Sequence, residues 1–359
     1  MHSVRKRCQQ NSLWTGSPAD FLDKAGESAV RCGHTGGHPG GLTRSRSITM
    51  RLPYSEFAAT YQVVTPFRIP AHPGSMWRGV IGRILRREGC AKQSVCQESC
   101  QSPQTCLYSK LFDPPVPQPP PHRFLRGLRE APPPLLPLIG WSGNERLAPG
   151  DSFRIGLRCL GVLSDRERLC IEQVLRNVPA LPLGRDEGRV QLVSLSEEIR
   201  TERAATVRDG LSRPRESVSA RLHLITPLWM EQDGRLLTQI EFVRFFTDLM
   251  RRLTILCSLY GVLDPEDEAL FPELRALASA VQVQSARLVP LRWERHSRES
   301  DERHPLHGVL GSLTLIGPLL PFLPFLHMAE IAHLGKSTSF GLGRVQVEPL
   351  AAEQTVSGQ

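Results

Sequence analysis

A glycine-rich segment near the C-terminus holds the densest group of residues that could bind a phosphate. It reads HLGKSTSFGLGR and runs from His333 to Arg344. Glycine tolerates positive φ and lets a ligand approach the backbone, while lysine, serine, threonine and arginine donate hydrogen bonds. The segment therefore suits a phosphodiester backbone. The residues predicted to contact it are Gly335, Lys336, Ser337, Thr338, Gly341, Gly343 and Arg344.

The run Gly335-Lys336-Ser337 also invites comparison with the phosphate-binding loop of nucleotide hydrolases. That loop needs a further glycine five positions before the second one, and it joins a strand to a helix. Position 330, where that glycine would stand, is a glutamate, and the segment is expected to follow a helix rather than a strand. The comparison therefore fails. A glycine-rich hairpin turn without a ligand stays open as the alternative.

Four of the nine cysteines fall close together and form a second candidate site, with the spacing C-x5-C-x3-C-x5-C. Four thiolates in a short segment can hold a zinc ion or an iron–sulfur cluster, here in a structural role. The spacing departs from the tighter pairs of common zinc modules, so two disulfides or cysteines without a ligand stay open. The candidate metal ligands are Cys90, Cys96, Cys100 and Cys106.

The composition narrows the class of protein. With 359 residues, 40% of them hydrophobic, the chain is neither collagen, mucin nor a mostly disordered polymer. Nine cysteines in this length do not indicate a secreted disulfide scaffold, which favours a reducing cytoplasm. The net charge of +8 favours a polyanionic partner, although residues 1–49 carry half of it. We expect 1–49 to be a disordered leader or an upstream-extended start, because it lacks apolar periodicity.

Residues 308–329 contain no charged side chain and are long enough to cross a bilayer. Three prolines, at Pro318, Pro321 and Pro324, argue against a continuous helix there. The segment is better explained as a buried strand followed by a short helix. No membrane contact is expected.

The elements predicted to position these residues form two units, of which the first covers 50–195. Its predicted order is strand, helix, two strands, helix and strand, with a Cys-rich insertion at 89–134. Ser164-x-x-Glu167 is typical of a capping box and predicts the start of the second helix. The expected elements are a strand at 57–64, a helix from 73, strands at 135–139 and 153–162, a helix from 164, and a strand at 189–195.

The same order returns over 218–350, after a charged segment at 196–217 that we interpret as a linker. Thr238-x-x-Glu241 predicts a helix start and Gly261 its end. Strands are expected at 218–226, 292–296, 309–316 and 344–348, a helix at 322–333, and a tail at 351–359. The fold class predicted is α+β: two tandem ferredoxin-like (βαββαβ, RRM-like) domains with a C-terminal glycine-rich loop.

This arrangement resembles the RAMP superfamily of CRISPR-associated proteins, and within it the endoribonucleases that process CRISPR repeat transcripts. The glycine-rich loop carries the resemblance, which covers roughly 50–349. Further similar segments are GSMWRGVIG at 74–82, LYSKLF at 107–112 and PLHGVLG at 305–311. The resemblance implies that the loop and Arg78 bind repeat RNA, and that the RNA is cut without a metal ion or other cofactor. A ribose 2′-OH would attack the adjacent phosphate and leave a 2′,3′-cyclic phosphate.

Members of this family often place the general base, a histidine, near the first helix of the N-terminal unit. That resemblance indicates His72 as the base, with Lys336 as a phosphate-neutralising cation and His333 as a further candidate. Two other functions stay open. One is a non-catalytic RNA-binding subunit that works with other CRISPR-associated effector subunits, and the other is a metal-binding scaffold protein.

Overall fold

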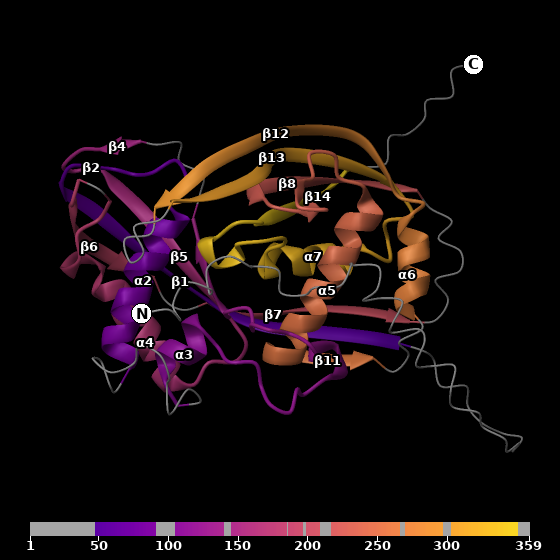
Figure 1. The fold of residues 1–359 in the computed structure, drawn as a ribbon, viewed down its shortest axis with the longest axis horizontal. Helices are drawn as coiled ribbons and strands as arrows, with labels where there is room; N and C mark the ends of the chain where they lie inside the picture. The colour runs from indigo at the N-terminus through magenta and orange to yellow at the C-terminus, as the bar shows by residue number, and fades with distance from the viewer. Residues whose placement is uncertain are drawn as a thin grey trace, which may run out of the picture.

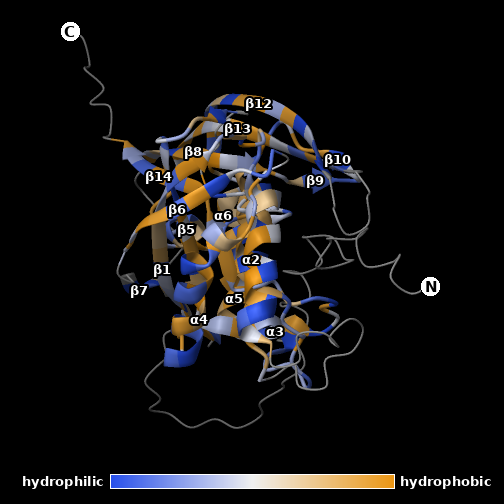
Figure 2. Ribbon diagram, turned by 90° about the vertical axis from the view of Figure 1, so that its left-hand side faces the viewer, coloured by the Kyte–Doolittle hydropathy of each residue, from blue (hydrophilic) through white to orange (hydrophobic). Residues whose placement is uncertain are grey.

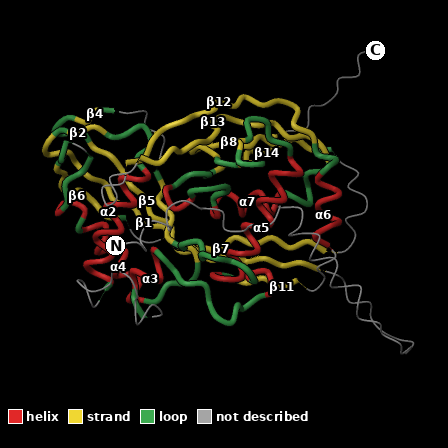
Figure 3. Tube along the Cα trace, in the orientation of Figure 1, coloured by secondary structure: helices red, strands yellow, loops and turns green. Residues whose placement is uncertain are grey.

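The structure is a computed structural model that describes residues 47–90, 105–139, 145–184, 186–196, 199–208, 217–265, 270–296 and 303–350. Two antiparallel sheets lie on either side of a layer of helices (Figure 1). Figure 3 shows the same layers, with α5, α6 and α7 between two groups of strands. The mixed α+β class predicted from the sequence is confirmed.

The N-terminal half is built around β1, a 19-residue strand from Ser47 to Thr65. Its first part pairs with β7 and β11, and its second part pairs with β5 and β6, while β3 pairs with β5. A small separate ladder joins β2 to β4. The other strands are β2 (Phe67–Arg68), β3 (Leu135–Leu138), β4 (Arg146–Leu147), β5 (Ser152–Leu160), β6 (Arg189–Leu195), β7 (Ile199–Arg208) and β11 (Val262–Pro265).

Two longer helices cover this sheet. α2 (Gly74–Gly89) buries one face at helical spacing, as predicted, because apolar residues recur every three or four positions. α4 (Asp165–Arg176) begins with the predicted capping box, in which the Ser164 hydroxyl accepts from the Glu167 N–H and the Glu167 carboxylate accepts from the Ser164 N–H. The shorter pieces are α3 (Leu107–Phe112), η3 (Arg123–Leu125) and η4 (Val178–Ala180).

The C-terminal half contains a four-stranded sheet in the order β12-β13-β8-β14. A two-residue ladder joins β9 to β10. The strands are β8 (Val218–Leu228), β9 (Glu231–Gln232), β10 (Arg235–Leu236), β12 (Gln282–His296), β13 (Arg303–Gly317) and β14 (Val345–Leu350), and the helices are α5 (Phe242–Tyr260), α6 (Leu270–Ala278), α7 (Leu323–Ala332) and η5 (Thr338–Phe340). None of the described helices is long and apolar enough to cross a membrane.

The predicted start of α5 is wrong. Glu241 is itself the N-cap, with extended backbone (φ −83°, ψ 141°), and no side chain caps the helix. Because Glu241 lies before the first turn, Thr238 is too far upstream to cap the helix. The predicted end at Gly261 is confirmed, since the Gly261 N–H donates to the Cys257 carbonyl.

The segment interpreted as a linker contains a strand. β7 pairs with β1 over ten residues, and Ala205 and Val207 on it are buried. Its abundant charge suggested a solvated connection, but strands with one exposed face carry charges on that face. The predicted leader likewise ends earlier than expected, because Ser47 already belongs to β1. Residues 1–46, 91–104 and 351–359 lie outside the described part of the chain.

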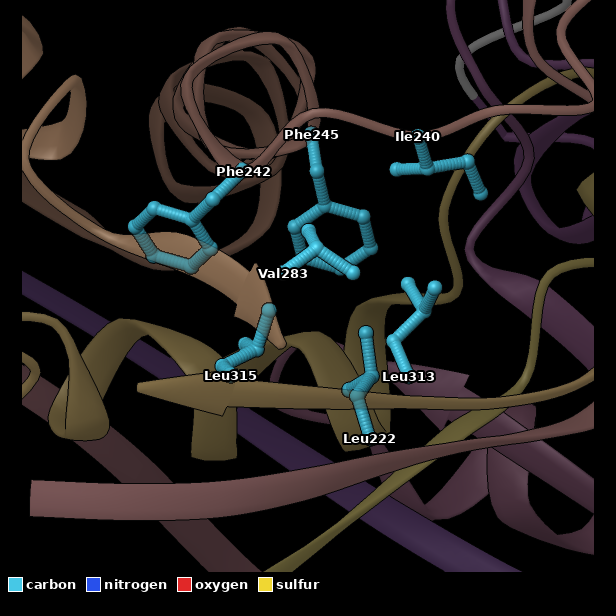
Figure 4. Close-up of a pocket in the computed structure, with 7 residues that line it drawn as sticks. All are labelled: Leu222, Ile240, Phe242, Phe245, Val283, Leu313 and Leu315. Carbon is cyan, nitrogen blue, oxygen red and sulfur yellow. The ribbon is translucent and has the colours of Figure 1, made fainter. Parts of the chain in front are cut away.

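One hydrophobic core joins the two halves. It combines residues from the first part of β1, such as Ile48 and Met50, with residues of α5 and α7, such as Phe246 and Phe325. A second core belongs to the N-terminal half alone and includes Trp77. An apolar gap inside the joint core (Figure 4) carries no charged or titratable side chain; its lining is Leu222, Ile240, Phe242, Phe245, Val283, Leu313 and Leu315. The shared core therefore packs the two halves against each other.

Candidate active site between α2 and the glycine-rich loop

The start of α2 touches the glycine-rich loop. A Cβ atom added to Gly74 would lie 1.8 Å from the Phe340 carbonyl oxygen and 2.6 Å from Cε1 of His72. Only glycine allows this approach, because real Cβ contacts essentially never fall below 3.0 Å. The fold therefore brings His72, from the N-terminal half, next to the loop that was predicted to bind phosphate.

His72 lies under the hairpin formed by β12 and β13. Its imidazole stacks on the Trp293 ring with centroids 5.2 Å apart, and its exposed fraction is 3%. Burial lowers the pKa of His72 to about 4. The imidazole is therefore neutral at pH 7, which is the form that can accept a proton.

Removing the indole should change the acidity of His72. We expect Trp293→Ala to raise the pKa of His72 from about 4 towards 6.5, because water would reach the imidazole and favour its charged form. Titration of the His72 ring resonances by NMR measures this pKa in both proteins. An unchanged pKa in the variant would show that the Trp293 ring does not control access to His72.

Two arginines, Arg78 and Arg295, lie near the Phe340 ring of the glycine-rich loop. The Arg78 guanidinium, on α2, lies 4.0 Å from the Phe112 ring centroid and 5.5 Å from that of Phe340. The Arg295 guanidinium, on β12, lies 5.0 Å from the same Phe340 centroid. Burial lowers the pKa of Arg78 to about 10, while Tyr108 and Asp113 act in the opposite direction and Arg295 adds the smallest lowering effect.

The glycine-rich loop is packed into the protein rather than open to solvent. Ser337, Thr338, Gly341 and Gly343 are buried, while Gly335, Lys336 and Arg344 are half-buried. The Gly343 N–H donates to the Pro227 carbonyl and the Lys336 N–H to the Trp229 carbonyl. These contacts use two of the backbone donors that were predicted to meet RNA, and the half-buried residues are the more accessible part of the loop. Contact of the loop with RNA stays a prediction.

Lys336 already has a carboxylate partner. Its ammonium group forms an ion pair with the Glu231 carboxylate and lies 5.7 Å from the Trp229 ring centroid. The Trp229 Nε1–H donates to the same carboxylate at 2.6 Å. The sequence analysis missed this carboxylate. It offsets the positive charge of Lys336 that was predicted to neutralise a phosphate.

His333 lies inside the protein, and its catalytic role stays a prediction. It is fully buried at the end of α7 with φ +52°. Burial, followed by the charges of Arg158, Arg344 and Arg252, lowers its pKa well below the usual value. As the structure stands, the His333 side chain has no exposed surface.

Two buried arginines hold the chain at this point. Arg158 Nη1, from β5, donates to the Glu330 and Ile331 carbonyls at 2.8 and 3.1 Å, and Arg252, from α5, donates to the Ala332 carbonyl. Cations at the C-terminus of a helix oppose the negative end of its dipole and satisfy carbonyls that lack helical partners. α7, and the loop that follows it, are therefore fixed from both halves.

The cysteine cluster is described only in part. Cys90 is buried at the end of α2, Cys106 is half-buried at the start of α3, and both thiols are free. Burial, and more weakly the neighbouring Cys90 thiol, raise the pKa of Cys106. Two of the four predicted ligands thus lie next to each other, while Cys96 and Cys100 lie outside the described residues.

The sequence analysis missed Trp293, Arg295, Phe340 and Glu231 as residues near the site. Hydrophilic and hydrophobic residues alternate along β12 (Figure 2). Trp293 and Arg295 lie two positions apart on this strand and therefore share one of its faces. The sequence gives no sign that this face meets His72 and Phe340, since these contacts join segments far apart in the chain.

Comparison with protein families now assigns the two halves. Residues 52–219 match the family model AF_1859_N, described as an N-terminal domain, and residues 222–345 match the model of the CRISPR-associated endoribonuclease Cas6. The C-terminal half is a Cas6 domain. This match confirms the resemblance inferred from the glycine-rich loop, because that loop lies within the Cas6 domain. β7 falls within the N-terminal match.

Solved structures of Cas6 proteins overlap most of the chain at low identity. A Cas6 product complex has a TM-score of 0.48 and 16% identity over 83% of this chain and 99% of that one. Cas6 from Thermus thermophilus has a TM-score of 0.44 and 15% identity, over 86% of this chain and 100% of that one. A partial Cas6-RT-Cas1–Cas2 complex has a TM-score of 0.47 and 10% identity, over 83% of this chain and 46% of that one. No curated protein sequence matches the chain.

Proposed function

We propose that the chain is an endoribonuclease that processes CRISPR repeat RNA without a catalytic metal ion, with its site where α2 meets the glycine-rich loop. One observation carries this proposal: the neutral His72 imidazole lies beside the Phe340 carbonyl of that loop, inside a two-part chain whose second half is a Cas6 domain. Each half is proposed to be a ferredoxin-like unit, because each contains the order βαββαβ among further elements. The elements concerned are β1, α2, β3, β5, α4 and β6 in the first half and β8, α5, β12, β13, α7 and β14 in the second.

The proposed reaction needs a base, a leaving-group proton and cations. A ring nitrogen of His72 takes the proton from a ribose 2′-OH, and the 2′-oxygen forms a bond to the adjacent phosphorus. The bond from phosphorus to the 5′-oxygen breaks, and that oxygen takes a proton from water. The products are a 2′,3′-cyclic phosphate and a free 5′-OH. Cations beside the phosphate stabilise the additional negative charge of the transition state.

The burial of His72 imposes a condition on this proposal. With 3% exposure, the imidazole can meet a ribose only when the Trp293 ring moves aside. Binding of RNA across the hairpin of β12 and β13 would have to supply that movement. The stacking of an aromatic pair contributes about 0.5 to 1.5 kcal/mol beyond area burial, which RNA binding can offset.

A series of repeat RNAs, each with one 2′-deoxyribose, tests the mechanism. We expect a single position to abolish cleavage, namely the nucleotide whose 2′-OH is the nucleophile, while the RNA still binds. Cleavage of every RNA in the series would exclude attack by a 2′-OH. Tight binding with no cleavage of the unmodified repeat would instead support the non-catalytic subunit.

We also propose a structural metal at the cysteine cluster, supported by the proximity of the Cys90 and Cys106 thiols. Thiolates bind zinc and iron, and closing the segment between α2 and α3 would be the function of such a site. Elemental analysis of the purified protein should find about one zinc ion or one iron–sulfur cluster per chain, and Cys90→Ser with Cys106→Ser should remove it. Absence of stoichiometric metal from the unaltered protein would refute this site.

A further inference from the structure

We propose that Arg78 and Arg295, one from each half of the chain, form a clamp that binds the scissile phosphate of the RNA next to His72. This inference rests on the proposed function and adds the residues that hold the reacting group. Arg295 belongs to no motif that the sequence analysis singled out. The clamp also gives the Phe340 ring a role, because both guanidinium groups lie against it.

The geometry of Phe340 defines the clamp. The two guanidinium groups lie 5.5 Å (Arg78) and 5.0 Å (Arg295) from the centroid of its ring. The Phe340 carbonyl lies beside the Gly74 backbone and the His72 ring. The cations and the proposed base therefore surround one residue of the glycine-rich loop. In RNA the reacting 2′-OH lies close to the charged oxygens of the adjacent phosphate, so the base and the cations must also lie close together.

The charges of the clamp are not closed by ion pairs within the described residues, although Asp113 lies near enough to Arg78 to raise its pKa. Among the described residues, no ion pair is formed by either guanidinium group of the clamp. Arg158 differs, because it pairs with the Glu56 carboxylate at 2.6 Å. Two cations of like charge close together raise the free energy of the site unless an anion joins them. A phosphate, which accepts hydrogen bonds from guanidinium groups in bidentate geometry, is the anion that fits.

Both side chains remain within reach of a ligand. Arg78 and Arg295 are half-buried, so their charges are only partly screened by water and can still meet an RNA backbone. Aromatic contacts hold both guanidinium groups in place before RNA arrives. Such preorganisation is what a transition state with developing charge requires.

The test combines cleavage rates with the salt dependence of binding. We expect Arg295→Met and Arg78→Met each to lower the single-turnover rate on repeat RNA by about 10²-fold or more. The slope of log K against log salt concentration should fall by about 0.7 for each lost phosphate contact with single-stranded RNA. A purely structural role would leave that slope unchanged. Arg295→Lys should recover part of the rate, because it keeps the charge but loses the planar fork.

Arg287→Met is the matched control, since Arg287 is exposed on the same strand β12, eight positions before Arg295. It should change neither the rate nor the salt slope. Arg78 also packs on Phe112, so melting temperatures are needed to show that each variant is folded. If the unaltered protein neither binds nor cleaves repeat RNA, the proposed function fails. If it cleaves RNA while folded Arg78 and Arg295 variants cleave at its rate, the clamp alone is refuted.

Discussion

Replacing His72 with alanine is expected to lower the rate of repeat RNA cleavage by about 10² to 10⁴-fold, the usual contribution of a general base. The imidazole lies beside the glycine-rich loop and is neutral at neutral pH, so it is the group placed to take the 2′-OH proton. Single-turnover kinetics with saturating protein measure the effect on the chemical step. The Kd for RNA should change little, because the base contributes mainly to the transition state.

Three controls separate this effect from a loss of folding. His327→Ala removes a half-exposed histidine on α7 and should leave the rate unchanged. Free imidazole should restore part of the activity of His72→Ala, since the substitution leaves room in a buried site. In the unaltered protein, kcat/KM should be level above about pH 5 and should fall as the pH drops through about 4, where His72 becomes protonated. Full activity of folded His72→Ala would disprove the assignment.

Replacing Arg158 with methionine is expected to lower the free energy of unfolding by about 3 kcal/mol. The substitution would leave the Glu330 and Ile331 carbonyls without their donor, and each buried, unsatisfied acceptor costs about 1 to 3 kcal/mol. It would also leave the Glu56 carboxylate unpaired, although that group is partly exposed and water can reach it. Urea denaturation measures the loss.

Arg154→Met on the same strand β5 is the control for this experiment. Arg154 is exposed, so its replacement should change the free energy of unfolding by at most about 0.5 kcal/mol. Arg158→Lys should give an intermediate loss, because an ammonium group cannot reproduce the paired hydrogen bonds of a guanidinium group. Equal stability of Arg158→Met and Arg154→Met would show that Arg158 does not connect the halves.

The sequence predicted best those elements whose signals are local. The buried face of α2 follows from apolar residues at helical spacing, and the start of α4 from a capping box whose two hydrogen bonds span three residues. β7 was missed because its charges resemble those of a linker, and its partner β1 lies far back in the chain. The start of α5 was misplaced because the same four-residue spacing can occur outside a helix.

The site was only partly predictable for the same reason. The glycine-rich loop and His72 could be singled out by composition and by resemblance. That the loop is largely buried, and that His72 lies under Trp293, depends on packing between the halves. The pairing of Lys336 with Glu231 likewise joins segments distant in sequence. Residue type indicates which side chains can carry out chemistry, whereas tertiary contacts decide which of them can meet a substrate.

Incubation of the protein with CRISPR repeat RNA in EDTA, followed by analysis of the product ends, tests the central claim most directly. The account predicts cleavage at one fixed position, with a 2′,3′-cyclic phosphate on the upstream fragment and a free 5′-OH on the downstream one. Cleavage that requires an added divalent metal, or products with a 3′-OH and a 5′-phosphate, would contradict it.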